Sequence, residues 1–170
     1  MALTKVRGAG AEGLTLSSTD LTVTSGDLIF ATSDKGVVLG ATSNTAVNTI
    51  SDYEEGTWTP TVSGLTLTAS TGHYVKIGKA VNFGFSVQVP SNSASTHFKI
   101  SNPPFNPHNP GGAGNNFGGA LNFANANVEN VTVILTTGND VQFYKQGAAF
   151  ATHADFSNGT VVASGTYLVA

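Results

Sequence analysis

The chain has 170 residues, enough for one compact domain with an appendage, and only 10% of them are charged, against roughly 25% in an average soluble domain. Seven Lys and Arg residues and a net charge of −3 exclude the basic surface that a nucleic-acid-binding protein needs. The absence of cysteine excludes a disulfide framework and thiol catalysis, and no apolar run is long enough to insert into a membrane.

Residues 1–12 carry Lys5, Arg7 and Glu12 and show no hydrophobic periodicity. They also lack the apolar stretch of a secretory signal peptide. We therefore interpret this part of the chain as an attachment segment or a disordered segment that precedes the folded part.

Residues 15–35 repeat a seven-residue phrase three times, in units 15–21, 22–28 and 29–35. The apolar positions are separated alternately by two and five residues, whereas a helical coiled coil needs separations of three and four. Each apolar pair is typical of a short strand, and each Ser/Asp cluster is typical of a turn. Because units this short become stable by stacking on neighbours, residues 13–50 are predicted to form a β-shaft and neck intertwined between copies of the chain.

From residue 51 to residue 170 the pattern is one of short strands separated by turns. The clearest strand has apolar residues at every second position from Val81 to Val89, so one of its faces is buried. Further strands are expected at 58–62, 65–67, 74–77, 97–100, 121–123, 128–135, 141–145 and 161–169. Turns are expected at 70–72, 78–79, 138–140 and 156–160, and a long loop rich in Pro and Gly at 101–119. This spacing predicts an all-β, antiparallel sandwich with a jelly-roll-like arrangement.

Several phrases of this region occur in a fixed order. SDYEEGTWTPTVSG at 51–64 is followed by GHYVKIGKAVNF at 72–83, ISNPPF at 100–105, a Gly-rich loop at 111–119, DFSNGT at 155–160 and SGTYLV at 164–169. Together they resemble the C-terminal head module of bacteriophage tail-fibre and related virion-fibre proteins.

The resemblance implies a β-rich head, usually trimeric, at the tip of a thin shaft. It implies a homotrimer located on the virion, joined to other virion proteins of the tail or capsid through residues 1–12. Asn102 and Pro103 stand where the family commonly has Gly-Leu before Pro-Phe, a departure that puts the shape of that turn in question.

The loop at 102–119 is the first candidate for a binding site, because long loops in compact domains are usually functional or disordered. Amides beside aromatic rings suit a neutral glycan. The candidate receptor-binding residues are Asn106, His108, Asn109, Asn115, Asn116 and Phe117. The alternative is a structural loop whose asparagines serve turns.

Asp52, Glu54 and Glu55 form a carboxylate cluster in one short segment. A glycosidase needs two carboxyl groups about 5–10 Å apart across a cleft, a geometry that one short segment rarely provides. We therefore expect these acids to be structural, pairing with Lys76 or Lys79, and we expect no catalytic residues.

Trp58 suits either a sugar-stacking surface or packing at the base of the head, and its Thr-Trp-Thr-Pro context favours packing. The four histidines lack metal-ligand spacing, although a trimer can gather three copies of one histidine on its axis. They are His73, His97, His108 and His153. The aspartates at 20, 27 and 34 fit turn positions, with a ladder of cation ligands as the alternative.

The chain is thus expected to be a homotrimeric virion fibre protein and not an enzyme, with a head that binds a glycan on the bacterial host surface and needs no cofactor or metal. The alternative is a structural or decoration fibre of the capsid or tail without a receptor. A depolymerase tip would need well-separated acids, and a bacterial adhesin would need a secretion signal.

Overall fold

The computed structural model describes residues 29, 31–32, 35–39, 49–50, 52–108, 116–124, 128, 130–136, 138–147 and 149–169. The attachment segment predicted at 1–12 and most of the β-shaft predicted at 13–50 lie outside these residues. Within the predicted shaft and neck, β1 (Val37–Val38) pairs antiparallel with β2 (Thr49–Ile50). The chain divides between Ser33 and Asp34, and every described strand belongs to the second part, Asp34–Ala170.

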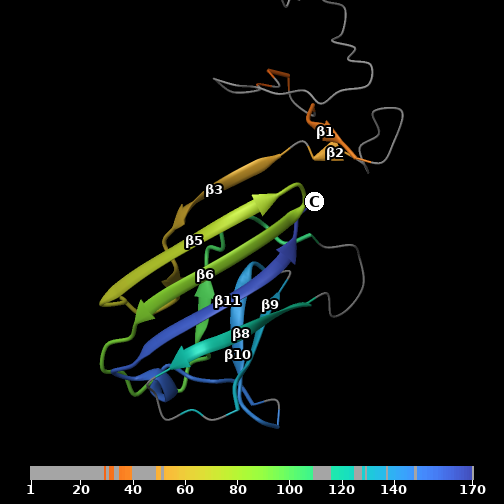
Figure 1. The fold of residues 1–170 in the computed structure, drawn as a ribbon. Coiled ribbons are helices and arrows are strands. Elements are labelled where there is room, and N and C mark those ends of the chain that lie inside the picture. The colour runs from red at the N-terminus through yellow and green to blue at the C-terminus, as the bar shows by residue number, and fades with distance from the viewer. Residues whose placement is uncertain are drawn as a thin grey trace, which may run out of the picture. The chain divides into compact units, whose positions relative to one another are not determined.

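The head is one antiparallel sheet of nine strands in the order β3-β5-β6-β11-β8-β9-β10-β7-β4 (Figure 1). The strands are β3 (Tyr53–Trp58), β4 (Thr61–Val62), β5 (Ala69–Ile77), β6 (Ala80–Gln88), β7 (Lys99–Ser101), β8 (Asn116–Ala124), β9 (Thr132–Thr136), β10 (Asp140–Tyr144) and β11 (Thr160–Leu168). The described residues contain no α-helix and one short 3-10 turn, η2 (Ala154–Phe156). The predicted all-β fold is confirmed.

The sheet curls because its two edge strands are consecutive in the chain. β3 and β4 occupy opposite edges, yet only Thr59 and Pro60 separate them. Three peptide links place Trp58 and Thr61 within about 11 Å of one another, so the edges must approach each other. In Figure 1 the long strands β5, β6 and β11 accordingly run obliquely across β9 and β10.

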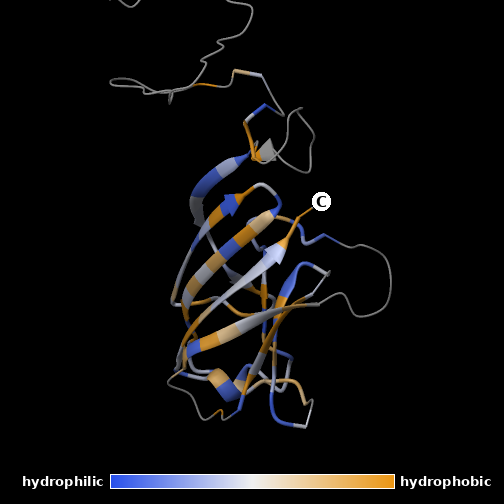
Figure 2. Cartoon of the chain, turned by 45° about the vertical axis from the view of Figure 1, so that its right-hand side comes forward, coloured by the Kyte–Doolittle hydropathy of each residue, from blue (hydrophilic) through white to orange (hydrophobic). Residues whose placement is uncertain are grey.

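The core fills the space inside the curl. In β6, β9 and β10, buried side chains alternate with more exposed ones, as expected for strands that have one face toward a core. Figure 2 shows hydrophobic residues interspersed with hydrophilic ones in the sheet. One half of the sheet contributes Trp58, Phe83, Phe85 and Tyr167. The other half contributes Phe98, Ile100, Val133, Leu135, Val141 and Phe143.

Backbone hydrogen bonds define two ends of the head. At the neck end, where the chain leads into β3, the Gly78 N–H donates to the Asp52 carbonyl (2.7 Å) and the Val169 N–H to the Lys79 carbonyl (2.9 Å). At the far end, the Val89 N–H donates to the Gly159 carbonyl (2.8 Å). Because neighbouring strands alternate in direction, β10 also runs from the neck end to the far end.

Three predicted features are wrong in detail. β5 continues through the turn expected at 70–72, because Gly72 lets the strand pass directly beside the Trp58 ring. The loop expected at 101–119 ends earlier, since residues 116–119 already belong to β8 and pair with β9. The strand expected at 65–67 is reduced to one isolated bridge between Leu65 and Val62.

Candidate ligand-binding surface

The predicted receptor-binding loop is anchored at the neck end of the head. The His108 N–H donates to the Leu168 carbonyl (2.7 Å), and Pro107 forms an isolated bridge with Val169. Asn106, just before this anchor, is exposed. The described start of the loop therefore lies beside the C-terminal strand.

The other end of the loop is part of the sheet. Asn116 opens β8 opposite Thr136, and the half-buried Phe117 ring lies 6.3 Å from the ring of Tyr167 and packs against the core. Asn109 and Asn115 lie outside the described residues. The role of these six residues in receptor binding stays a prediction.

Tyr167 fixes the start of the loop. Its hydroxyl accepts a hydrogen bond from the Phe105 N–H (3.1 Å) and donates one to the Phe105 carbonyl (3.0 Å). Burial raises the pKa of Tyr167 to about 12, against the smaller opposite effect of the Phe105 hydrogen bond, so the hydroxyl stays protonated at neutral pH. Asn102 adopts φ 65°, the left-handed conformation that glycine favours, so an asparagine meets this backbone requirement before Pro103.

The predicted pairing of the carboxylate cluster with Lys76 is confirmed. Lys76 on β5 forms an ion pair with Asp52. Beside it, the Tyr74 hydroxyl donates to Glu54 (2.6 Å), while Glu55 accepts from Tyr53 (2.8 Å). Each of the three acids is therefore engaged with a neighbouring side chain of β3 or β5.

Trp58 packs inside the head, as its sequence context predicts. Its ring meets Phe83 and Phe85 edge-on, with centroids 6.5 and 5.9 Å away, and only 9% of the residue is exposed. A sugar could not reach the buried face of this ring.

A cluster of three aromatic residues, here called the aromatic platform, lies at the far end of the head. It consists of His97, Tyr144 and Phe150. The His97 and Phe150 rings are 3.9 Å apart, and Tyr144 lies 5.7 Å from His97 and 5.1 Å from Phe150. Phe150 is 51% exposed, and the Tyr144 hydroxyl donates to the Gln142 side chain (2.7 Å). The platform thus presents one exposed aromatic ring, that of Phe150, on two partly buried rings, with the Gln142 amide beside Tyr144.

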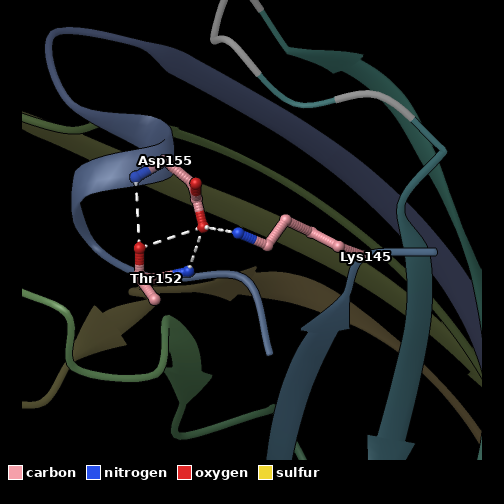
Figure 3. Close-up of polar contacts among 3 residues, drawn as sticks. All are labelled: Lys145, Thr152 and Asp155. Atoms are coloured by element: carbon pink, nitrogen blue, oxygen red, sulfur yellow. Dashed lines mark hydrogen bonds and ion pairs between the residues drawn. The ribbon is translucent and has the colours of Figure 1, made fainter. Parts of the chain in front are cut away.

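The hairpin that carries Phe150 is held by a polar cluster around Asp155 (Figure 3). One Asp155 carboxylate oxygen accepts hydrogen bonds from the Thr152 N–H (2.7 Å) and hydroxyl (2.9 Å) and pairs with Lys145 Nζ (2.9 Å). Burial alone would raise the pKa of Asp155, but the bonds from Lys145 and Thr152 outweigh it and hold the pKa below its ordinary value. The cluster ties both ends of the hairpin to η2.

At this end of the head, the pKa values of two histidines are lowered, which favours their neutral forms. Burial, aided by the nearby Lys99 charge, lowers the pKa of His97, and burial lowers the pKa of His153, which packs edge-on against Phe98 at 6.0 Å. Within the described ranges, no three His, Cys, Asp or Glu residues gather in a way that could hold a metal ion. A neutral His97 therefore acts as an aromatic surface beside Phe150.

The residues of the platform are of the kinds that bind a sugar ring. Aromatic faces stack against the apolar C–H face of a sugar ring, while an adjacent amide such as Gln142 supplies hydrogen bonds to hydroxyl groups. The three residues come from the segment before β7, the end of β10 and the hairpin after it, so no sequence motif unites them.

Comparison of the chain with known protein families and with curated proteins finds no match. Among the described residues, no helix is long and apolar enough to cross a membrane.

Proposed function

We propose that the chain is a homotrimeric phage virion fibre protein whose head binds the bacterial host surface through a glycan. The observation that carries the binding part is the aromatic platform, which lies at the end of the head opposite the point where Asp52 leads into β3. A fibre attached through its N-terminal side would present this end outward.

The order of the phrases that resemble virion-fibre heads supports the identity of the protein. The first two of them pair with each other along β3 and β5, from Tyr53 opposite Ile77 to Trp58 opposite Gly72. The acids of the first phrase serve this pairing, which supports a role in binding without catalysis.

The proposed mechanism is preorganised, multivalent attachment. Three heads on one axis present three platforms, so contacts that are individually weak act together with a high effective concentration. The Asp155 cluster holds the Phe150 hairpin before the ligand arrives, which lowers the entropy cost of binding.

The test measures binding of the full-length chain to arrays of bacterial surface polysaccharides. Phe150→Ala is expected to weaken binding at least tenfold, because it removes the exposed ring of the platform. Tyr53→Ala is the matched control, since it removes a 63%-exposed aromatic ring at the neck end and should leave binding unchanged.

Two other outcomes contradict parts of the proposal. If Asn106→Ala abolishes binding and Phe150→Ala does not, the receptor site belongs to the 102–119 loop. If the wild-type chain binds no host polysaccharide or cell surface, the alternative of a decoration fibre without a receptor is favoured.

A further inference from the structure

The outer surface of four neighbouring strands, β5, β6, β11 and β8, carries no formal charge, and it is bordered on β3 by Glu55, which stands opposite Val75. The outward-facing residues of β5, β6, β11 and β8 come from alternate positions of long, mutually paired strands, except at the β-bulge of β8, where Asn122 and Phe123 are consecutive. They are Thr71, His73, Val75, Ile77, Ala80, Asn82, Gly84, Ser86, Gln88, Thr160, Val162, Ser164, Thr166, Leu168, Gly118, Ala120, Asn122 and Phe123. None is Asp, Glu, Lys or Arg, although about a quarter of an average soluble domain is charged. We call this surface the neutral face.

The neutral face carries apolar side chains at its two ends and small side chains in its middle. At the neck end, Ile77, Ala80 and Leu168 stand side by side across three strands, and Ile77 and Leu168 are 46% and 48% exposed. At the far end, Val162 pairs with Phe123, which is 54% exposed. Exposed apolar groups of this kind on a sheet indicate a surface that another protein covers.

The central row lets a partner approach closely. His73, Gly84, Ser164 and Ala120 occupy neighbouring positions on four adjacent strands. Around this row, polar side chains form hydrogen bonds with one another. The Thr166 hydroxyl donates to Asn82 (2.7 Å), and the Asn122 amide donates to Ser164 (3.0 Å). Such pairs can be buried at low cost because their hydrogen bonds are already made.

The opposite half of the sheet has a different outer surface. There Lys99 lies 4.0 Å from Asp140, and the Ser101 hydroxyl donates to the same Asp140 carboxylate (2.7 Å). The absence of charge is therefore specific to the neutral face and is not a uniform property of the head.

We propose that the neutral face is the surface through which copies of this chain associate. A second copy fits its chemistry because two uncharged surfaces meet without repulsion and without buried unpaired charge. Nucleic acid and anionic lipid would need cations, which the face lacks. Four strands of nine residues cover about 19 by 30 Å, or about 570 Å², which is about 70% of the roughly 800 Å² that each partner of a stable interface buries. The inference that copies associate rests on the neutral face itself, and only the expectation of three copies rests on the proposed function.

The test uses the fact that the full-length chain has no cysteine. Ala120→Cys places a single thiol on the neutral face, and Thr61→Cys places one at an exposed position of the edge strand β4, in the other half of the sheet. Maleimide labelling should be at least tenfold slower for Ala120→Cys than for Thr61→Cys at concentrations where light scattering gives an oligomer. Adding Thr166→Glu to Ala120→Cys should restore fast labelling, because it puts a charge into the contact.

Equal labelling of the two thiols, whether fast or slow, would overturn the inference, and so would slow labelling of Ala120→Cys in a monomer. Failure of the wild-type chain to bind any host surface while the thiol stays protected would contradict the proposed receptor binding alone. The two proposals can therefore fail separately.

Discussion

At the scale of single residues, Gly72 and Trp58 show how closely the chain is packed. A Cβ atom added at Gly72 would lie 2.3 Å from the Trp58 indole nitrogen, so the ring would have to move within a core that also holds Phe83 and Phe85. We expect Gly72→Ala to lower the free energy of unfolding by about 1–3 kcal/mol, as overpacking commonly does. Urea unfolding at a fixed protein concentration, followed by the fluorescence of the single tryptophan, measures this loss.

Gly138→Ala is the control for this prediction. A Cβ atom there would meet only the Thr136 hydroxyl at 3.4 Å, an ordinary contact, and should change stability little. Equal stability of the two variants would mean that Trp58 can rotate away without loss.

Asp155 gives a prediction about pH. Its pKa in the folded protein is below the ordinary value of 3.8, because the bonds from Lys145 and Thr152 outweigh the effect of burial. The ionised carboxylate therefore stabilises the fold above about pH 3.8, and this contribution is lost as the pH falls through the folded-state pKa. We expect Asp155→Asn to cost about 1 kcal/mol at pH 7, the contribution of a typical hydrogen bond, and the difference from wild type to shrink in acid.

Thermal unfolding between pH 7 and pH 3 checks the second expectation. Lys145→Gln should reproduce part of the loss, and the double variant should lose less than the sum, because both residues act in one cluster. A gap between wild type and Asp155→Asn that stays constant down to pH 3 would exclude the ionic role of this carboxylate.

At the scale of elements, Tyr167 connects β11 to the start of the 102–119 loop. Tyr167→Phe would leave the N–H and carbonyl of Phe105 without their present partner, which costs about 1–3 kcal/mol when such groups are buried. We expect the Phe105 amide to exchange hydrogen at least tenfold faster in this variant. Tyr144→Phe, which removes a bond only to Gln142, should leave the exchange of Phe105 unchanged.

Local patterns in the sequence predict most of the strands. The alternation from Val81 to Val89 corresponds to β6, and the turn signals at 138–140 and 156–160 coincide with Asn139 and Asn158 at positive φ. Local patterns fail for β5, because the sequence Ser70-Thr71-Gly72 is typical of a turn although these residues lie within the strand. Glycine is required at position 72 because the Trp58 ring lies against it. That requirement comes from a tertiary contact, which the pattern of a single sequence does not contain.

The aromatic platform could not be predicted for the same reason. His97, Tyr144 and Phe150 meet only because β10 pairs with β7 and the hairpin after β10 folds back onto it. The contacts of Asp52, by contrast, could be predicted, since the acids and Lys76 occur in two phrases that pair as neighbouring strands.

At the scale of the whole molecule, the neutral face predicts how assembly responds to salt. Interfaces held by ion pairs weaken as added ions screen them, whereas an uncharged interface does not. We expect the concentration at which the oligomer dissociates to change less than about threefold between 0.05 and 0.5 M NaCl. Analytical ultracentrifugation of the full-length chain measures this. Dissociation that becomes tenfold easier with salt would assign the contact to charged residues elsewhere.

The position of β3 determines how the head carries tension. The chain leads into it at Asp52, and β3 lies along β5 from Tyr53 opposite Ile77 to Trp58 opposite Gly72. A pull directed out of the neck end acts along the axis of β3, perpendicular to its hydrogen bonds, so the whole ladder is loaded in shear at once and cannot be peeled apart bond by bond. The attachment proposed above would therefore load β3 in the direction in which its ladder of hydrogen bonds resists force best.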